Sequence, residues 1–150
     1  MSTVFNFTFV PWFRAVAPYI HMHRGKTFVV GVVGEAIAAG KLASIATDLA
    51  LIQSMGVKIV LVHGFRPQVN EQLRAKGHEP RYAHGLRITD EVALDSAQEA
   101  AGQLRFEIEA AFSQGLPNTP MAGPKARVIS GNFLTARPMG IIDGADFKHT

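Results

Sequence analysis

The sequence predicts an α/β fold in which three layers are built on a mainly parallel β-sheet. Two apolar runs rich in β-branched residues, 26–33 and 57–62, are typical of strands buried on both faces. The segment between them, 41–55, carries apolar residues at every third or fourth position, which predicts a helix. Such a helix is long enough for a right-handed crossover between parallel neighbours, so we expect the two strands to pair in parallel.

Length and composition limit the class of protein. The 150 residues are 47% hydrophobic and 18% charged, which is typical of one globular domain. No apolar run approaches the roughly 20 residues of a membrane span, so no membrane partner is expected. The net charge is +3, but the basic residues are scattered, so nucleic acid is not an expected partner. The absence of cysteine agrees with a cytoplasmic location.

The N-terminal region divides into an arm, 1–10, and a following helix. Phe5, Phe7 and Phe9 recur at period two in the arm, which is typical of a short strand or of a poorly ordered segment. From residue 11 onwards, apolar residues lie on one helical face, and Pro18 predicts a break in this helix. We expect the exposed aromatic face to pack on a partner or on the protein's own domain. The residues of that face are Trp12, Phe13, Val16 and Ile20.

The second strand leads into a turn and a helix. His63 to Arg66 form the predicted turn, Pro67 suits the first helical position, and Gly77 suits the left-handed residue that ends a helix. A helix that starts directly after a strand directs its free N–H groups towards an anion, although an ordinary βα turn has the same pattern. Arg66 favours the anion site because it places a fixed positive charge in the turn.

The second half of the chain begins with a polar loop, 78–87. Thr89 is the expected N-cap of a long amphipathic helix that ends near Ser113. Residues 127–130 and 133–137 are then predicted to form two strands joined by a hairpin turn at Gly131-Asn132. The segment 140–150 is rich in turn residues and is expected to contain no terminating element.

Candidate site residues gather where the two strands end. Gly31 and Gly34 match neither the dinucleotide-binding pattern nor the P-loop pattern. His21 and His23 point to different faces of a helix, so no metal site is expected. Arg66 and Arg87 both lie beside expected helix starts, and the planar fork of an arginine binds a carboxylate or a phosphate. Together they suggest a site for an acidic small molecule. The anion-binding candidates are Gly34, Gly64, Arg66 and Arg87.

Several motifs, in the same order along the chain, resemble those of the bacterial N-acetylglutamate synthase family. The motifs are HRGKTFVVGVVGEAI, VLVHGFRPQVN, GLRITD and SGNFLTARPMGIIDGADFKHT. The resemblance is to the amino-acid-kinase domain of that family and extends over residues 11–150. It implies the N-terminal half of an amino-acid-kinase, or carbamate-kinase-like, fold.

Two departures from the related N-acetylglutamate kinases concern the phosphate turns. Those kinases carry a Lys-x-Gly-Gly turn whose Lys contacts the transferred phosphate, where this chain has Gly31 and Val33 in place of the Lys and the first glycine. They also carry an H-G-x-G-P turn, where this chain has Arg66 in place of a glycine. Both departures argue against phosphoryl transfer, because that chemistry depends on positive groups placed around the phosphates.

The resemblance therefore implies the arginine-sensing module of an acetyltransferase. Enzymes of this family transfer acetyl from acetyl-CoA to L-glutamate in the first step of arginine biosynthesis and are inhibited by L-arginine. We expect this chain to be a fragment without the acetyltransferase domain, without catalytic residues and without a cofactor, from a parent that is a homo-oligomer. Tyr19 is the candidate for the arginine site. An acetylglutamate kinase and a non-catalytic amino-acid-binding module remain as alternatives.

Overall fold

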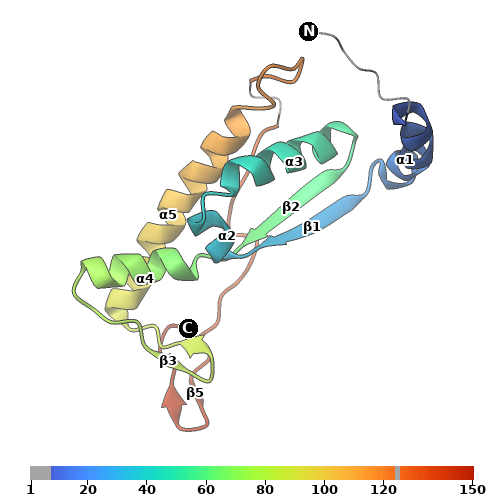
Figure 1. The fold of residues 1–150 in the computed structure, drawn as a ribbon. Coiled ribbons are helices and arrows are strands. Elements are labelled where there is room, and N and C mark those ends of the chain that lie inside the picture. The colour runs from blue at the N-terminus through green and yellow to red at the C-terminus, as the bar shows by residue number, and fades with distance from the viewer. Residues whose placement is uncertain (1–7, 124–125) are drawn as a thin grey trace.

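The computed structural model describes residues 8–123 and 126–150, which form helices and short strands around a parallel strand pair (Figure 1). The elements are, in chain order, α1 (Phe9–His23), β1 (Thr27–Val32), α2 (Gly34–Ala38), α3 (Leu42–Ser54), β2 (Lys58–His63), α4 (Arg66–Ala75), β3 (Tyr82–Ala83), β4 (Leu86–Arg87), α5 (Glu91–Ser113), β5 (Ile141–Ile142) and β6 (Ala145–Asp146).

The strand pair confirms the predicted β-α-β arrangement. β1 pairs with β2 in parallel, from Thr27 opposite Lys58 to Val32 opposite His63. α3 connects the two strands and ends at Ser54, and Gly56 follows it with a φ of +93°, which suits a glycine. α4 starts with Pro67 in its first turn and is followed by Gly77 at φ +76°, as the sequence predicts.

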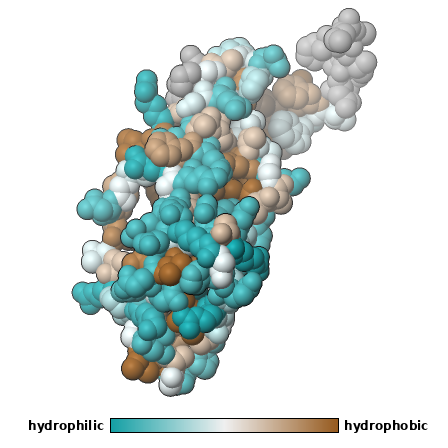
Figure 2. Space-filling view, turned by 90° about the vertical axis from the view of Figure 1, so that its left-hand side faces the viewer, coloured by the Kyte–Doolittle hydropathy of each residue, from teal (hydrophilic) through white to brown (hydrophobic). Residues whose placement is uncertain are grey.

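Two apolar clusters hold the helices in place. The first lies between α3 and α5 and receives Val30, Ile59 and Leu61 from the strands. The second joins α4 to the first half of α5 through Val69, Leu73, Ala93 and Ala100. α5 therefore packs against α3 and α4. The side of the molecule that α4 and α5 present outwards is largely hydrophilic (Figure 2).

The prediction that both strands are buried on both faces is wrong. α3 and α5 cover the face that carries Val30, Ile59 and Leu61. The opposite face remains open, with Val29 70% exposed and Val62 55% exposed. The reason is that both covering helices lie on one side of the strand pair. Because side chains alternate between the two faces, every second side chain of each strand remains exposed to water.

The N-terminal helix differs from the prediction in its start and its continuity. α1 begins at Phe9 and runs through Pro18 to His23, so the predicted break is absent. Pro18 is exposed and removes one backbone donor, and the helix continues on both sides of it. α1 has no buried residue, so its aromatic face does not pack on the described body of the protein. Phe5 and Phe7 lie outside the described residues.

The N-cap of α5 is Asp90 rather than Thr89. The Asp90 backbone is extended, and its Oδ1 atom accepts a hydrogen bond from the N–H of Ala93 at 3.0 Å. Thr89 is buried instead, and it forms a parallel bridge with Lys148 near the end of the chain. The sequence offers two capping residues in succession, and the bridge to Lys148 engages the first of them.

The hairpins also differ from the prediction. Residues 127–137 contain no strand, and Ile129 and Leu134 are 83% and 91% exposed. The segment expected to lack a terminating element instead contains the β5–β6 hairpin, whose turn residues Asp143 and Gly144 both have positive φ. A second hairpin, β3–β4, lies in the region predicted as a polar loop and turns at His84-Gly85, again with positive φ at both positions.

Candidate functional site

The turns after β1 and β2 lie together at the C-terminal edge of the strand pair. The N–H of Gly64 donates to the carbonyl of Val32 at 2.8 Å, which ties the second turn to the end of β1. Gln68, in the first turns of α4, donates to the carbonyl of Gly34 at 3.2 Å. The expectation that the Gly34 turn and the start of α4 share one edge is therefore confirmed.

Gly34 and Gly64 are in contact with each other. A Cβ atom at Gly34 would lie 2.9 Å from Cδ of Pro67 and 3.0 Å from the carbonyl carbon and oxygen of Gly64. A Cβ atom at Gly64 would lie 3.1 Å from the backbone nitrogen of Gly34. The two glycines therefore allow the two turns to approach each other closely, and this steric role explains both of them without a ligand.

Arg66 and Arg87 meet at the ring of Tyr82. Their guanidinium carbons lie 5.6 Å and 5.2 Å from the centre of that ring, within the range of a cation–π contact. Nη2 of Arg66 also approaches the carbonyl of Gly85 at 3.4 Å, and Nη2 of Arg87 donates to the carbonyl of Arg66 at 3.3 Å. The β3–β4 hairpin thus brings Arg87 to the start of α4.

Asn70 lies one turn after Arg66 on α4 and connects Arg87 with Tyr82. Its Oδ1 atom accepts from Nη2 of Arg87 at 2.7 Å and from the hydroxyl of Tyr82 at 2.8 Å. Sequence reasoning missed Asn70 and Tyr82 as members of this group. The spacing of Asn70, four residues after Arg66, places the two on one face of α4 and is the only sequence signal for it.

The positive charges of Arg66 and Arg87, the arginine pair, are not fully compensated by negative groups. Burial lowers the pKa of Arg87, the neighbouring Tyr82 raises it, and the positive charge of Arg66 lowers it further. Nη1 of Arg87 is buried without a hydrogen-bond partner. In the described part of the chain, neither guanidinium forms a salt bridge with a carboxylate. Arg66 and Arg87 therefore carry positive charge that no carboxylate of the described residues offsets, and this arrangement favours an added anionic group.

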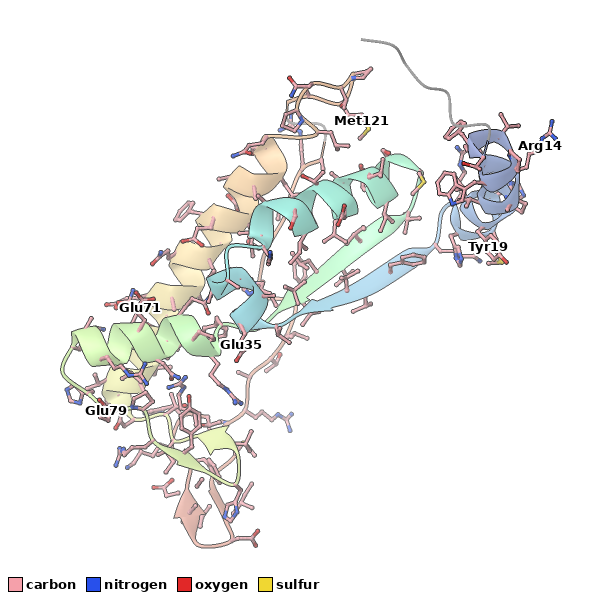
Figure 3. All side chains as sticks on the ribbon, viewed as in Figure 1. Arg14, Tyr19, Glu35, Glu71, Glu79 and Met121 are labelled. Carbon is pink, nitrogen blue, oxygen red and sulfur yellow. The ribbon has the colours of Figure 1, made fainter. Side chains whose placement is uncertain are left out.

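Tyr19 lies apart from these residues. It is 62% exposed on α1, which leads into the first residue of β1, whereas the arginine pair lies beyond the last residues of the strands. Figure 3 shows Tyr19 on α1, at the far end of the strand pair from Glu71 on α4. The structure therefore does not combine the arginine-site candidate with the anion-site candidates.

Among residues 8–123 and 126–150, no group of three or more His, Asp or Glu side chains is placed to hold a metal ion. Within the same ranges, no helix is both long and apolar enough to cross a membrane.

Residues 26–149 match the amino acid kinase family. The chain is 58% identical over 142 residues to an amino-acid acetyltransferase of Ralstonia nicotianae. The aligned region covers 95% of this chain and 32% of the relative. It is 50% identical over 141 residues to the amino-acid acetyltransferase of Photobacterium profundum, covering 94% of this chain and 32% of the relative. The chain thus spans about a third of the length of the curated relatives it matches.

Solved structures give the same relationship. N-acetylglutamate synthase from Neisseria gonorrhoeae, in complex with coenzyme A and L-arginine, matches 93% of this chain with a TM-score of 0.82 and 41% identity. The match covers 33% of that synthase chain. The same enzyme in complex with coenzyme A and N-acetyl-glutamate gives a TM-score of 0.76 and 42% identity, over 93% of this chain and 31% of the other.

Proposed function

The chain belongs to the amino acid kinase family, and we propose that it forms the N-terminal part of the kinase-like, arginine-sensing module of an N-acetylglutamate synthase. The parent enzyme transfers acetyl from acetyl-CoA to L-glutamate in the cytoplasm, as a homo-oligomer, with L-arginine as its feedback inhibitor. The observation that carries this proposal is the match over 93% of the chain, at a TM-score of 0.82, to a synthase bound to coenzyme A and arginine.

The two phosphate turns support the synthase rather than the kinase alternative. Gly31 lies in β1 and supplies no cation at the position where the kinases carry a lysine. Arg66 begins α4, and its side chain extends to the ring of Tyr82 and the carbonyl of Gly85. Since phosphoryl transfer depends on donors placed around the phosphates, this arrangement does not favour it.

The arginine pair is proposed to bind an acidic group of a small molecule. Arg66 and Arg87 supply the positive charge, and no carboxylate of the described residues forms a salt bridge with either guanidinium. Gly34 and Gly64 contribute indirectly, because their contact allows α4 to begin directly at the sheet edge. Tyr19 on α1 is proposed to belong to the separate arginine site of the module.

A chimera tests the proposed function in a complete enzyme. This chain would replace the matching segment of the Neisseria gonorrhoeae synthase, and a thiol reagent would follow the release of coenzyme A from acetyl-CoA and glutamate. We expect glutamate-dependent release that falls when L-arginine is added. A folded chimera, checked by circular dichroism and gel filtration, that is active but insensitive to arginine would contradict the sensing role.

A variant pair in the same chimera tests Tyr19. Tyr19→Ala is expected to raise the arginine concentration needed for half-inhibition, because it removes a side chain of the proposed arginine site. Met22→Ala is the matched control, since Met22 is also exposed on α1, at 54%. Equal arginine inhibition in the two variants would exclude Tyr19 from the site.

A further inference from the structure

We propose that Tyr82 and Asn70 are positioning residues that hold the guanidinium groups of Arg66 and Arg87 for a small oxyanion. This inference rests on the proposed anion site and adds the groups that organise it. Neither Tyr82 nor Asn70 was singled out by the sequence, and both contact Arg87 directly.

The ring of Tyr82 offsets an electrostatic conflict. Two arginine side chains repel each other, yet the guanidinium carbons of Arg66 and Arg87 both lie within 6 Å of one ring centre, at 5.6 Å and 5.2 Å. The face of an aromatic ring is electronegative and attracts both cations. The ring thus keeps two positive charges in one place before any anion arrives.

Asn70 fixes the direction of the Arg87 fork. Nη2 of Arg87 donates to Oδ1 of Asn70 at 2.7 Å, and the hydroxyl of Tyr82 donates to the same oxygen at 2.8 Å. Nη2 also donates to the carbonyl of Arg66, so α4 holds this nitrogen through two acceptors. Because the two hydrogen bonds to Asn70 share one acceptor, a single side chain on α4 fixes the Tyr82 ring and the Arg87 guanidinium relative to each other.

The position of Tyr82 links the arginine pair to a short element. Tyr82 and Arg87 are register partners in the β3–β4 hairpin, which has only two residues in each strand. A hairpin of this length has little stability of its own. An oxyanion held by both arginines therefore stabilises the hairpin against α4, and the chain should unfold at a higher temperature when the anion is bound.

The experiment uses the 150-residue chain and two probes, sodium phosphate and sodium acetate, each at an ionic strength matched with sodium chloride. The unfolding temperature is measured against probe concentration, which gives an apparent dissociation constant. The wild type is expected to be stabilised by phosphate or acetate beyond the chloride control. The more effective probe identifies whether the site prefers a phosphate or a carboxylate group.

Variants then separate positioning from charge. Tyr82→Leu removes the ring and is expected to weaken the apparent affinity about tenfold, whereas Tyr82→Phe keeps the ring and is expected to weaken it less. Asn70→Leu removes the shared acceptor without changing the charge, so it is expected to weaken the apparent affinity as Tyr82→Leu does. Arg74→Ala on the same helix is the control for the loss of one exposed positive charge.

The outcomes distinguish the two proposals. If neither probe stabilises the wild type beyond chloride, or if Arg87→Ala retains the full effect, the anion site itself is refuted. If the wild type responds and Arg87→Ala does not, but Tyr82→Leu and Asn70→Leu respond like the wild type, the anion site stands and the positioning role is refuted. A weaker response in Tyr82→Leu and Asn70→Leu, with an unchanged fold and an unchanged response in Arg74→Ala, supports the positioning role.

Discussion

Gly34→Ala tests the close contact between the two turns at the sheet edge. The new Cβ atom would lie 2.9 Å from Cδ of Pro67 and 3.0 Å from the carbonyl group of Gly64. Backbone atoms cannot rotate away as a flexible side chain can, so one turn must move. Gly34 itself is buried at the start of α2, where displacement of the turn also affects the hydrogen bond from Gln68.

The expected magnitude follows from two opposing effects. Overpacking of this kind costs about 1–3 kcal/mol, while replacing glycine by alanine stabilises by about 0.4–1 kcal/mol through the unfolded chain. The net expectation for Gly34→Ala is a loss of about 1–2 kcal/mol. Gly31→Ala is the matched control, since no atom lies within 4 Å of its added Cβ and its φ is not positive. That variant should be neutral or slightly more stable.

Urea unfolding of both variants, followed by far-ultraviolet circular dichroism, gives the two free energies of unfolding. Gly34→Ala is expected to unfold at a lower urea concentration than the wild type, and Gly31→Ala is not. Equal stability of the two variants would refute the steric account of the glycine pair, and the anion-binding role of these glycines would then need to be considered again.

Three further predictions concern other parts of the chain. Asp90→Ala should cost about 1 kcal/mol as a lost N-cap. The hydrogen bond from Ala93 lowers the pKa of Asp90, so this stabilisation is present above the ordinary aspartate pKa. It is lost as the pH falls through the lowered value, and unfolding curves of wild type and variant should converge there. Pro18→Ala should increase the helix signal in circular dichroism, because it restores a backbone donor within α1; an unchanged signal would contradict this. The chain should not phosphorylate N-acetylglutamate with ATP, and acetylglutamyl phosphate above a control without protein would contradict the assignment of the two turns.

Local sequence patterns determined the two parallel strands, the helix between them and the helix that follows the second strand. The β-branched runs, the helical spacing of 41–55 and the positions of Pro67 and Gly77 each act over a few residues. Parallel pairing followed from the length of the crossover. A helix of that size carries the chain from the end of the first strand back to the edge where that strand began, so the second strand runs in the same direction. Arg66 could therefore be placed at the sheet edge beside the Gly34 turn from the sequence.

Hairpin positions depended on tertiary packing. Gly131-Asn132 and Asp143-Gly144 are both reasonable turn pairs, yet only the second forms a hairpin turn. Phe147, just after that hairpin, is completely buried, and its backbone is bonded to Thr89 and Gly140. The bond with Thr89 joins segments far apart in the sequence, so local turn preference could not distinguish the two candidates.

The candidate site shows the same division. The sequence determined that Arg66 and Arg87 stand beside helix starts, and the fork geometry of arginine suggested an anion. Tertiary structure decided that the β3–β4 hairpin folds back onto α4, which brings Tyr82 and Arg87 to Arg66 and Asn70. It also decided which strand face is covered, because burial depends on where helices pack and a strand's own pattern only fixes which side chains share a face.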